Sequence, residues 1–269
     1  MKNGMLPVER QREIVSRVET AGSVRTVELA RALEVAQETI RRDLDKLAAE
    51  GRLTRIHGGA LSLANVRREI PFDVREVVNL KQKRALARAA AGYVREGDVI
   101  ALDASSTVRE LARLIPDAPL TVVTNSIAVA TVLLDRPQVR VVSTGGTLDG
   151  PSLSYVGPPA EEALERYAIR RTFLSCTAID PERGLAVATG EHARIKRRMM
   201  QLADEVILLV DASKFSAQGV EFFAAPDEVD VLVTDTGAPA AVVKALRKLG
   251  VTVRQGAAED AVPARTPGP

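Results

Sequence analysis

The sequence contains very little cysteine and histidine. Cys176 is its single cysteine, and its two histidines, His57 and His192, lie far apart along the chain. One cysteine cannot form a disulfide within the chain, and a structural metal site needs several cysteine or histidine ligands. We therefore expect neither a disulfide nor a metal centre.

Long apolar runs and a strong net charge are also absent. No stretch approaches the roughly 18 apolar residues of a membrane span, and the first residues, MKNGMLPVERQREI, lack the apolar core of a secretory signal. We therefore expect a cytoplasmic protein with no membrane partner. The 37 Lys and Arg residues nearly balance the 35 Asp and Glu residues, so the overall charge does not indicate a nucleic-acid ligand, although a local basic face is compatible with one.

The composition that remains is that of an ordinary globular protein. The chain has 269 residues, of which 46% are hydrophobic and 27% are charged, close to the typical values of about 45–50% and about 25%. Because domains usually hold roughly 100–200 residues, this length predicts two domains.

Residues 1–63 are expected to form the first domain, and their pattern is helical. Apolar residues recur with helical spacing at about residues 9–21, 27–33 and 37–50. Gly22 and Gly51 are expected to end the first and third helices, and Thr26 to cap the second. In the third segment the apolar residues share one face, which leaves the opposite face polar and free.

The second and third segments match a helix-turn-helix, in which the later helix enters the major groove of DNA. Residues 52–60 then alternate polar and apolar side chains and turn at Gly58-Gly59, which predicts a β-hairpin wing. We therefore expect this domain to bind double-stranded DNA. The candidate DNA-binding residues are Gln37, Glu38, Thr39, Arg41 and Arg42 in the helix and Arg52, Arg55 and His57 in the wing.

The arginines of the third helix also have a simpler interpretation. Glu38 with Arg42, and Arg41 with Asp45, are spaced four residues apart, so these arginines could form surface ion pairs worth roughly 0.2–0.5 kcal/mol. Their place on the free face of a winged helix-turn-helix favours contacts with phosphates or base edges. Which arginine reads a base stays open.

The rest of the chain predicts an α/β domain. Residues 64–78 are interpreted as a linker anchored by Phe72, residues 79–256 as the second domain, and residues 257–269 as a flexible tail. Apolar strand candidates alternate with helical segments, which argues for a mostly parallel sheet covered by helices. The strand candidates are residues 98–102, 120–124, 139–143, 172–176, 205–210, 229–234 and 251–254, and the helical segments are about 80–95, 107–115, 126–134, 159–167, 191–203 and 238–248.

Three of these strands end in hydroxyl or glycine residues. Two of the loops then open a helix, whose start favours anions, and open α/β sheets bind ligands at the carboxyl ends of their strands. A phosphate would fit a crevice shared by the three loops, whereas each serine or threonine alone could be an ordinary helix cap. The candidate effector-binding residues in these loops are Asp103, Ser105, Ser106, Thr107, Thr124, Asn125, Ser126, Gly145 and Gly146.

Further charged residues follow the later strands. Lys214 could supply a cation to a phosphoryl group, and Asp180 and Glu191 could hold sugar hydroxyls, although each alone is more often a solvated surface residue. The run Arg194–Arg198 has the composition of a nucleic-acid patch, but its position in an amphipathic helix favours a solvated face. Cys176 is interpreted as a buried small hydrophobe.

The motifs resemble the DeoR family of sugar-metabolism regulators over about residues 9–236. In the first domain, ERQREI at residues 9–14, TIRRDL at 39–44 and RIHGGA at 55–60 resemble the family's DNA-binding module. The second domain resembles its sensor domain in the motifs KRALA at residues 83–87, DASST at 103–107, TNS at 124–126, GG at 145–146, VG at 156–157, IKRR with Lys196 at 195–198, and DASKF at 211–215. The order of these motifs is that of the family.

The resemblance implies a winged helix-turn-helix regulator of carbohydrate genes. Such a protein acts as a repressor or an activator, responds to a phosphorylated sugar or related small metabolite, and forms a homodimer or a higher homo-oligomer. The sequence departs from the family pattern at Ala36, where a serine commonly precedes the recognition helix, at Ala212, and at residues 175–179, where a glycine-rich strand end is usual.

An enzymatic alternative follows from the same resemblance. The DeoR-type sensor domain is similar in fold to sugar-phosphate isomerases, including ribose-5-phosphate isomerase, so the second domain could be a working isomerase with Asp180 or Glu191 as its base. The acidic and lysine motifs of the isomerases are not recognisable in this sequence. We therefore expect ligand binding without turnover, with no catalytic residue and no cofactor.

Overall fold

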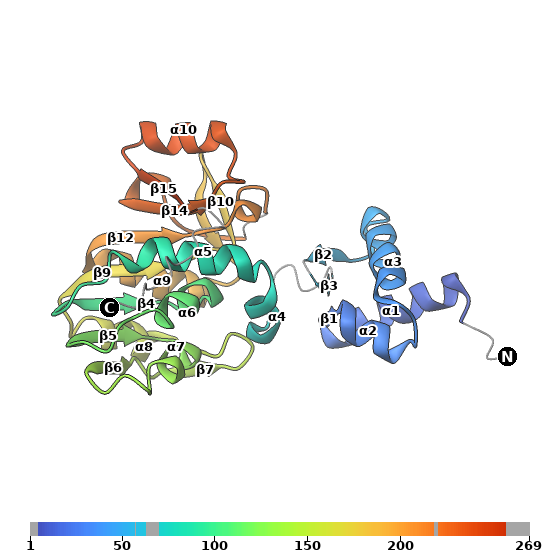
Figure 1. Ribbon diagram of the computed structural model, residues 1–269, viewed down its shortest axis with the longest axis horizontal. Helices are drawn as coiled ribbons and strands as arrows, with labels where there is room; N and C mark the ends of the chain where they lie inside the picture. The colour runs from blue at the N-terminus through green and yellow to red at the C-terminus, as the bar shows by residue number, and fades with distance from the viewer. Residues whose placement is uncertain (1–4, 57, 63–69, 218–219, 257–269) are drawn as a thin grey trace, which may run out of the picture.

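The computed structural model describes residues 5–56, 58–62, 70–217 and 220–256, which fold into two parts (Figure 1). A small helical part precedes a larger α/β part. The small part contains α1 (Pro7–Ala21), β1 (Ser23–Arg25), α2 (Thr26–Ala32), α3 (Gln37–Ala49), β2 (Thr54–Ile56) and β3 (Gly59–Leu61). The expected winged helix-turn-helix followed by a mostly parallel α/β domain is confirmed.

The three helices of the small part enclose one apolar core. Its fully buried members come from every helix and include Ile14, Leu29, Ile40, Leu44 and Leu47. The third helix begins after Ala36, which makes no side-chain cap, and is followed by Gly51 in the left-handed region, as expected.

The wing is a three-stranded sheet rather than a simple hairpin. The sequence pattern missed β1, a three-residue strand that pairs with β3. Gly59 must be glycine at this pairing, because a Cβ there would lie 2.1 Å from the Val24 carbonyl oxygen. Ile56 pairs with Gly59, so Gly59 is the first residue of β3 and not part of the expected Gly58-Gly59 turn.

Thr26 does not cap the second helix. It is the first residue of α2, and its buried hydroxyl has no partner among the described residues. Arg25 occupies the capping position instead, and its backbone N–H donates to the Glu28 side chain.

The larger part is built on a sheet of seven strands that all pair in parallel. The strand order is β15-β14-β12-β9-β4-β5-β6. The strands are β4 (Val99–Leu102), β5 (Leu120–Thr124), β6 (Val139–Ser143), β9 (Ile169–Leu174), β12 (Ala203–Leu209), β14 (Val231–Asp235) and β15 (Thr252–Gly256). Each overlaps one of the seven expected strands, since parallel strands buried on both faces appear in the sequence as continuous apolar runs.

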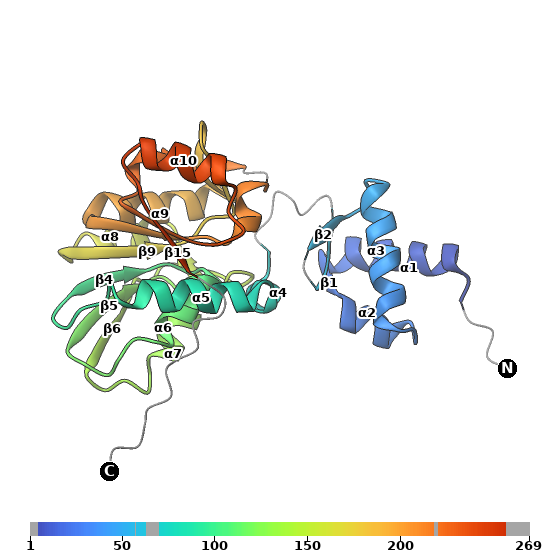
Figure 2. The same ribbon diagram turned by 45° about the horizontal axis from the view of Figure 1, so that its top comes forward.

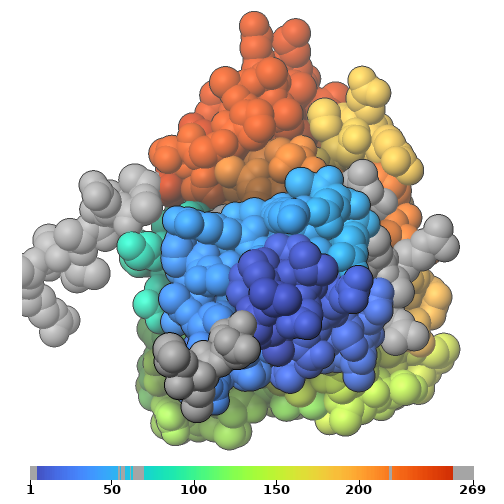
Figure 3. All heavy atoms as spheres, turned by 90° about the vertical axis from the view of Figure 1, so that its right-hand side faces the viewer, coloured from blue at the N-terminus to red at the C-terminus, as the bar shows by residue number. Residues whose placement is uncertain are grey.

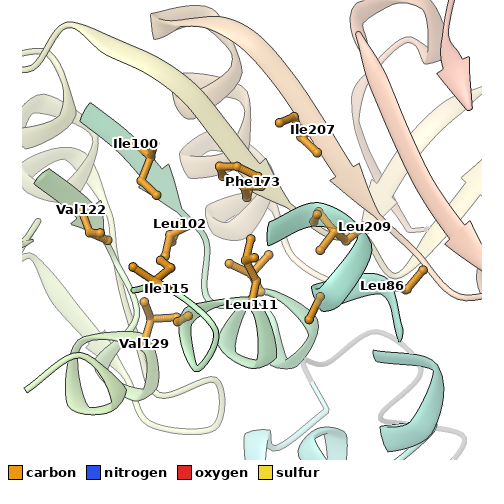
Figure 4. Close-up of a cluster of buried hydrophobic side chains, with 14 of the residues drawn as sticks. Leu86, Ile100, Leu102, Leu111, Ile115, Val122, Val129, Phe173, Ile207 and Leu209 are labelled. Atoms are coloured by element: carbon orange, nitrogen blue, oxygen red, sulfur yellow. The ribbon is translucent and has the colours of Figure 1, made fainter. Parts of the chain in front are cut away.

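Helices cover both faces of this sheet. Successive strand residues point to opposite faces, so Leu102 and Val122 pack under α5 (Leu80–Ala91), α6 (Ser106–Ala112) and α7 (Ile127–Val132), whereas Ala101 and Val123 pack under α8 (Pro158–Leu164) and α9 (Gly190–Leu202). Figure 4 shows the first of these clusters, with Phe173 near its centre. A further helix, α10 (Ala240–Lys248), packs over β14 and β15.

Several short elements were missed by the sequence pattern. They are the antiparallel hairpin of β7 (Thr147–Asp149) and β8 (Ser154–Val156), an antiparallel sheet of β10 (Ala178–Asp180), β11 (Gly184–Val187) and β13 (Glu221–Ala224), and the 3-10 turns η2 (Ala212–Phe215) and η3 (Pro226–Glu228). Runs of three or four residues are too short to show a period.

The range expected to be a linker contains a helix, α4 (Phe72–Val77). Phe72 is buried as expected, and its ring lies under the guanidinium groups of Arg75 and Arg109. Figures 1 and 2 show α4 on the side of the α/β part that faces the helical part, and Figure 3 shows the helical part in front of the α/β part when viewed from that side. Arg25 donates to the backbone oxygen of Asp73 at 2.9 Å, so α4 also contacts the helical part directly.

Candidate DNA interface and effector site

The polar face of α3 carries the residues expected to contact DNA. Gln37, Glu38, Arg41 and Arg42 are exposed and Thr39 is half-buried, whereas Ile40 and its apolar neighbours face the core. A helix of 13 residues thus presents one side to solvent and is fixed by the other. This is the arrangement that a recognition helix requires.

The ion-pair interpretation of the two arginines is partly supported. Arg41 lies 3.4 Å and Arg42 lies 3.5 Å from carboxylate oxygens of Glu38, so the expected pair of Arg41 with Asp45 is replaced by a pair with Glu38. The side chains of Arg41 and Arg42 are 57% and 81% exposed. Exposed pairs of this kind contribute little stability, and both guanidinium groups stay accessible.

The wing is attached to the recognition helix by Arg55. Its Nε donates to Asp45 at 2.7 Å and its Nη1 donates to the Gly59 carbonyl at 2.6 Å. Arg55 therefore orients the wing relative to α3. Arg52 is exposed at the start of the wing, and His57 lies outside the described residues.

Asp43 is a functional residue that the sequence pattern missed. It is buried in α3, and its two oxygens accept hydrogen bonds from Arg10 at 2.5 Å and from Gln11 at 2.8 Å, both in α1. A buried acid in a helix gives no periodic signal in the sequence, because its burial depends on hydrogen-bond donors from the partner helix. These bonds fix the angle at which α3 presents its polar face.

Replacing Asp43 with alanine is expected to destabilise this domain. The change leaves the nearly buried Arg10 without its carboxylate, so we expect a loss of about 2–4 kcal/mol in the free energy of unfolding. Chemical denaturation, with hydrogen exchange of α1 and α3 as its local readout, would measure the loss in the free energy of unfolding. Asp45→Ala, which removes an exposed carboxylate two residues away, should cost less than about 1 kcal/mol; equal losses would contradict the structural role of Asp43.

The α/β part has a topological switch point between β4 and β9. From β4 the chain adds β5 and β6 on one side, and then returns to place β9 on the other side. In open α/β sheets the crevice beyond the strand ends at such a point is the usual ligand site. The expected loops of residues 103–107 and 124–126 both lie at this edge of the sheet.

Asp103 joins the two strand ends at the switch point. Its carboxylate accepts hydrogen bonds of 2.9 Å from the backbone N–H groups of Ser105 and Ser175, which follow β4 and β9. Lys196 of α9 donates to the same carboxylate, and both side chains are buried. Asp103 and Lys196, two expected effector-binding residues, are therefore brought together.

Two lysines lie close to this centre. The Lys83 ammonium donates to the backbone oxygen of Arg75, and Ser106 Oγ donates to the same oxygen at 3.3 Å. Burial, and next the positive charge of Lys214, lower the pKa of Lys83 from 10.5 to about 7. Neither lysine forms an ion pair within the described part of the chain. The negative charges of Asp211 and Glu110 act on Lys83 but do not outweigh burial and the neighbouring cations, so the positive charge at this end of the site is only partly balanced.

Cys176 shows that these charged groups surround one region. The thiol is buried as expected, and burial raises its pKa to about 12, with smaller effects from Lys214, Lys196, Asp103 and Asp211. Asp211, which follows β12, also accepts a hydrogen bond of 3.0 Å from Asn79. The loops after β4, β9 and β12 thus meet around the switch point.

The helix-cap interpretation holds for two of the serines. Ser105 Oγ accepts from the Val108 N–H at 3.1 Å, and Ser126 Oγ accepts from the Val129 N–H at 3.2 Å. Thr124 is also used internally, since its hydroxyl donates to the Leu102 carbonyl at 2.6 Å. These three hydroxyls shape the loops, whereas Ser106 is the serine that lies beside Lys83.

The remaining candidate effector-binding residues of the three loops differ in their contacts. Thr107 is buried in α6. Asn125 donates to the Tyr155 carbonyl at 3.0 Å, but its buried Oδ1 has no partner among the described residues. Gly145 and Gly146 both have positive φ angles, and a Cβ on Gly146 would lie 2.8 Å from the Val156 carbonyl oxygen. The glycine pair therefore permits a close approach of the β7–β8 hairpin to α8.

Asp180 and Glu191 do not join this cluster in any described contact. The Asp180 carboxylate accepts from the Glu182 and Arg183 N–H groups of its own turn, and these bonds lower its pKa. Glu191 is exposed on α9. The next residue, His192, is the one that is buried on the inner side of the helix, where its Nε2 lies 3.0 Å from Asp149.

Comparison with known proteins gives a matching family for each of the two parts of the chain. Residues 10–66 match the family described as the DeoR-like helix-turn-helix domain, and residues 78–236 match the family described as the DeoR C terminal sensor domain. The chain belongs to the DeoR family. It is a DNA-binding transcriptional regulator of this family, with the recognition helix and the switch-point site in separate domains.

The similarity of the DeoR-family chain to known regulators extends over nearly its whole length. It is 43% identical to the uncharacterized HTH-type transcriptional regulator YulB of Bacillus subtilis, with 93% of this chain and 96% of that protein covered. It is 34% identical to a putative aga operon transcriptional repressor of Escherichia coli O157:H7, covering 91% and 92%. Among solved structures, ribose 5-phosphate isomerase A of Methanocaldococcus jannaschii is similar at 19% identity and a TM-score of 0.39, over 51% of this chain and 55% of that one.

The described part of the DeoR-family chain offers neither a cluster of metal ligands nor a helix suited to a membrane. No group of three or more His, Cys, Asp or Glu side chains suited to a metal ion occurs among those residues. Within the same ranges, no helix is both long enough and apolar enough to cross a membrane.

Proposed function

We propose that this regulator is a repressor of carbohydrate genes whose binding to operator DNA is controlled by a phosphorylated sugar. The observation that carries the proposal is the position of Lys83 beside Ser106, with the charge of Lys214 close enough to act on Lys83, next to the hydrogen-bonding centre of Asp103 and Lys196. A phosphate would supply the missing negative charge, and the sugar would extend toward the switch point.

DNA binding is assigned to the polar face of α3 and to the wing. Arg41 and Arg42 are proposed to contact phosphates or base edges, with Gln37, Glu38, Thr39, Arg52 and His57 around them. One recognition helix contacts few base pairs, and symmetric dimers double the contacts on repeated half-sites. We therefore include a homodimer or larger homo-oligomer, acting in the cytoplasm, in the proposal.

Helix α4 offers a physical path between the two sites. The Arg75 carbonyl accepts from both Lys83 and Ser106, and Arg109 forms an ion pair of 2.6 Å with Glu76. A phosphate that binds Lys83 and Ser106 would compete for the donors that hold α4. Because Asp73 of α4 accepts from Arg25 of the DNA-binding domain, a shift of α4 would reach the recognition domain.

The enzymatic alternative is the second candidate function, and the site gives it little support. Asp180 and Glu191, the carboxylates suggested as bases, lie outside the Asp103 and Lys196 centre in the described contacts. The protein's relatives are named as transcriptional regulators. We therefore propose binding without turnover.

A thermal-shift screen combined with a turnover assay tests this function. Full-length protein is expected to gain stability with at least one sugar phosphate, because a ligand that binds only the folded state stabilises it by mass action. The same compounds should show no aldose–ketose interconversion above background. Interconversion that is abolished by Asp180→Asn or Glu191→Gln would establish the enzyme instead, and the absence of any thermal shift would contradict the sugar-phosphate effector.

Effector affinity is expected to fall as the pH rises from 7 to 9. The ligand phosphate keeps its charge over this range, since its second pKa is about 6, whereas Lys83 with a pKa of about 7 loses its proton. Affinity should therefore fall by about tenfold or more over the two pH units. The unliganded protein should gain stability over the same range, because the unfolded chain, with its ordinary lysine pKa of 10.5, binds more protons.

Titration calorimetry at pH 7, 8 and 9 measures this dependence. Lys83→Arg is the informative variant, because a guanidinium stays charged throughout, so its affinity should change little with pH. A wild-type profile as flat as that of Lys83→Arg would show that Lys83 does not bind the anion.

A further inference from the structure

A row of hydrogen-bonded polar side chains joins α9 to the β7–β8 hairpin. His192 Nε2 lies 3.0 Å from Asp149 Oδ2, and Ser152 Oγ donates to the same oxygen. The hydroxyl oxygens of Ser152 and Ser154 lie 2.7 Å apart. These four residues, which we call the His–Asp–Ser row, come from two segments more than 30 residues apart and have no role in the function proposed above.

Asp149 is the member of the row that solvent can reach. Its side chain is 27% exposed, that of His192 is 7% exposed, and both serines are buried. Burial raises the pKa of Asp149, but the hydrogen bonds from Ser152 and His192 outweigh it and hold the pKa below its ordinary value. Both side-chain bonds go to Oδ2, and the Ser152 backbone N–H adds a smaller effect on the carboxylate. Asp149 is thus an oriented, partly exposed acceptor whose pKa is held low.

The row lies next to the centre of the effector site. His192 and Lys196 are four residues apart on the inner face of α9, which is about 6 Å along a helix axis, and Lys196 pairs with Asp103. Asp103 is followed by Ser106, which lies beside Lys83. Cationic groups therefore gather near Asp103 and Ser106, and the carboxylate of Asp149 lies at His192, one helical turn from Lys196.

The cationic groups and the Asp149 carboxylate suit different parts of one ligand. A carboxylate repels a phosphate but accepts a strong, charge-assisted hydrogen bond from a hydroxyl group. We propose that Asp149 accepts a hydrogen bond from a sugar hydroxyl of the effector, that His192 and Ser152 position its carboxylate, and that the His–Asp–Ser row thereby selects which sugar phosphate binds. This proposal rests on the sugar-phosphate function proposed above and adds the residue that distinguishes one sugar from another.

The row also has a structural role, since it fastens the hairpin to α9, so the test needs a quantity that fastening alone would not change. That quantity is the discrimination ratio, defined as the dissociation constant for inorganic phosphate divided by that for the tightest sugar phosphate. A looser fold would weaken the binding of both ligands by a similar factor. Removing a hydroxyl contact should weaken only the sugar phosphate, because inorganic phosphate needs only the lysine end.

The experiment is titration calorimetry of full-length wild type, Asp149→Asn, His192→Gln and the control Glu162→Gln. The probes are inorganic phosphate, ribose 5-phosphate, 2-deoxyribose 5-phosphate and the 6-phosphates of glucose, galactose, fructose and tagatose. Glu162 is exposed on α8, so its variant controls for the loss of a carboxylate charge outside the site. Circular dichroism checks that each variant is folded.

We expect Asp149→Asn to reduce the discrimination ratio at least tenfold and His192→Gln to reduce it by a smaller factor, with inorganic phosphate affinity changed less than about threefold. Glu162→Gln should match the wild type. Ratios within threefold of wild type in both row variants would overturn the proposal, as would equal weakening of phosphate and sugar phosphate. If wild type bound no sugar phosphate more tightly than inorganic phosphate, the sugar-phosphate function would be wrong as well, which distinguishes that failure from the other two.

Discussion

Replacing Arg41 and Arg42 together with alanine is expected to weaken operator binding by about 2–5 kcal/mol, roughly 30-fold to several thousand-fold in affinity. A single arginine that contacts a base is typically worth about 1–3 kcal/mol, and one that contacts a phosphate adds about one to the salt slope. Both side chains are more than half exposed, so the change leaves the domain core intact. The exposed pairs with Glu38 contribute too little to alter folding.

The measurement is a fluorescence anisotropy titration at several salt concentrations, on duplex DNA selected by the full-length protein from a random pool. Arg17→Ala is the matched control, because Arg17 of α1 forms the same kind of exposed pair, at 2.7 Å from Glu13. If the double variant bound like wild type at every salt concentration, the two arginines would be surface ion pairs only. A reduced salt slope with unchanged sequence preference would assign them to phosphates rather than bases.

The fold was predictable because its main signals are local. Most of the seven parallel strands contain a short apolar run, such as VIAL in β4 and VLV in β14, and the helices between them alternate with those runs, so the order of elements follows from the sequence. Gly51 likewise marks the end of α3, because glycine readily adopts the left-handed backbone found there. By contrast, β1 is three residues long and exists because β3 lies beside it.

The residues of the site were predictable only in part, because tertiary contacts decide which side chains meet there. The strand-end loops were found, but their hydroxyls could not be divided into caps and free groups from sequence, and only Ser106 lies beside Lys83. The sequence points to Glu191 as a site residue and not to its neighbour His192, because the face that α9 turns inward depends on the sheet beneath it. Lys83 opens the KRALA motif, but the sequence did not show it to be a site residue, since it is buried through its contact with the Arg75 carbonyl of α4.

Replacing Ser106 with leucine, or Lys214 with alanine, is expected to abolish the effector response while leaving operator binding intact. Ser106 lies at the proposed phosphate site, and Lys214 acts electrostatically on Lys83 in the same place. The recognition residues are in a separate domain. In the described residues, Arg25 of that domain contacts Asp73 of α4 in the effector-binding part. A ligand shifts a conformational equilibrium only by its differential affinity for the two states, so an effector without its phosphate contacts loses its influence on DNA.

The test compares operator affinity with and without the sugar phosphate that gives the largest thermal shift. Wild type should change its affinity by about 5- to 150-fold, the usual range of allosteric coupling, whereas each variant should change by less than twofold and behave as a permanent repressor. Lys248→Ala, at the exposed end of α10, is the matched lysine control and should respond like wild type. Leucine is larger than the buried Ser106 side chain, so thermal unfolding of each variant is measured as a check of folding. Lys214→Ala, at a less buried site, gives an independent answer. A full response in both variants would place the phosphate elsewhere, and loss of operator binding in a folded variant would show that the two sites are not separable.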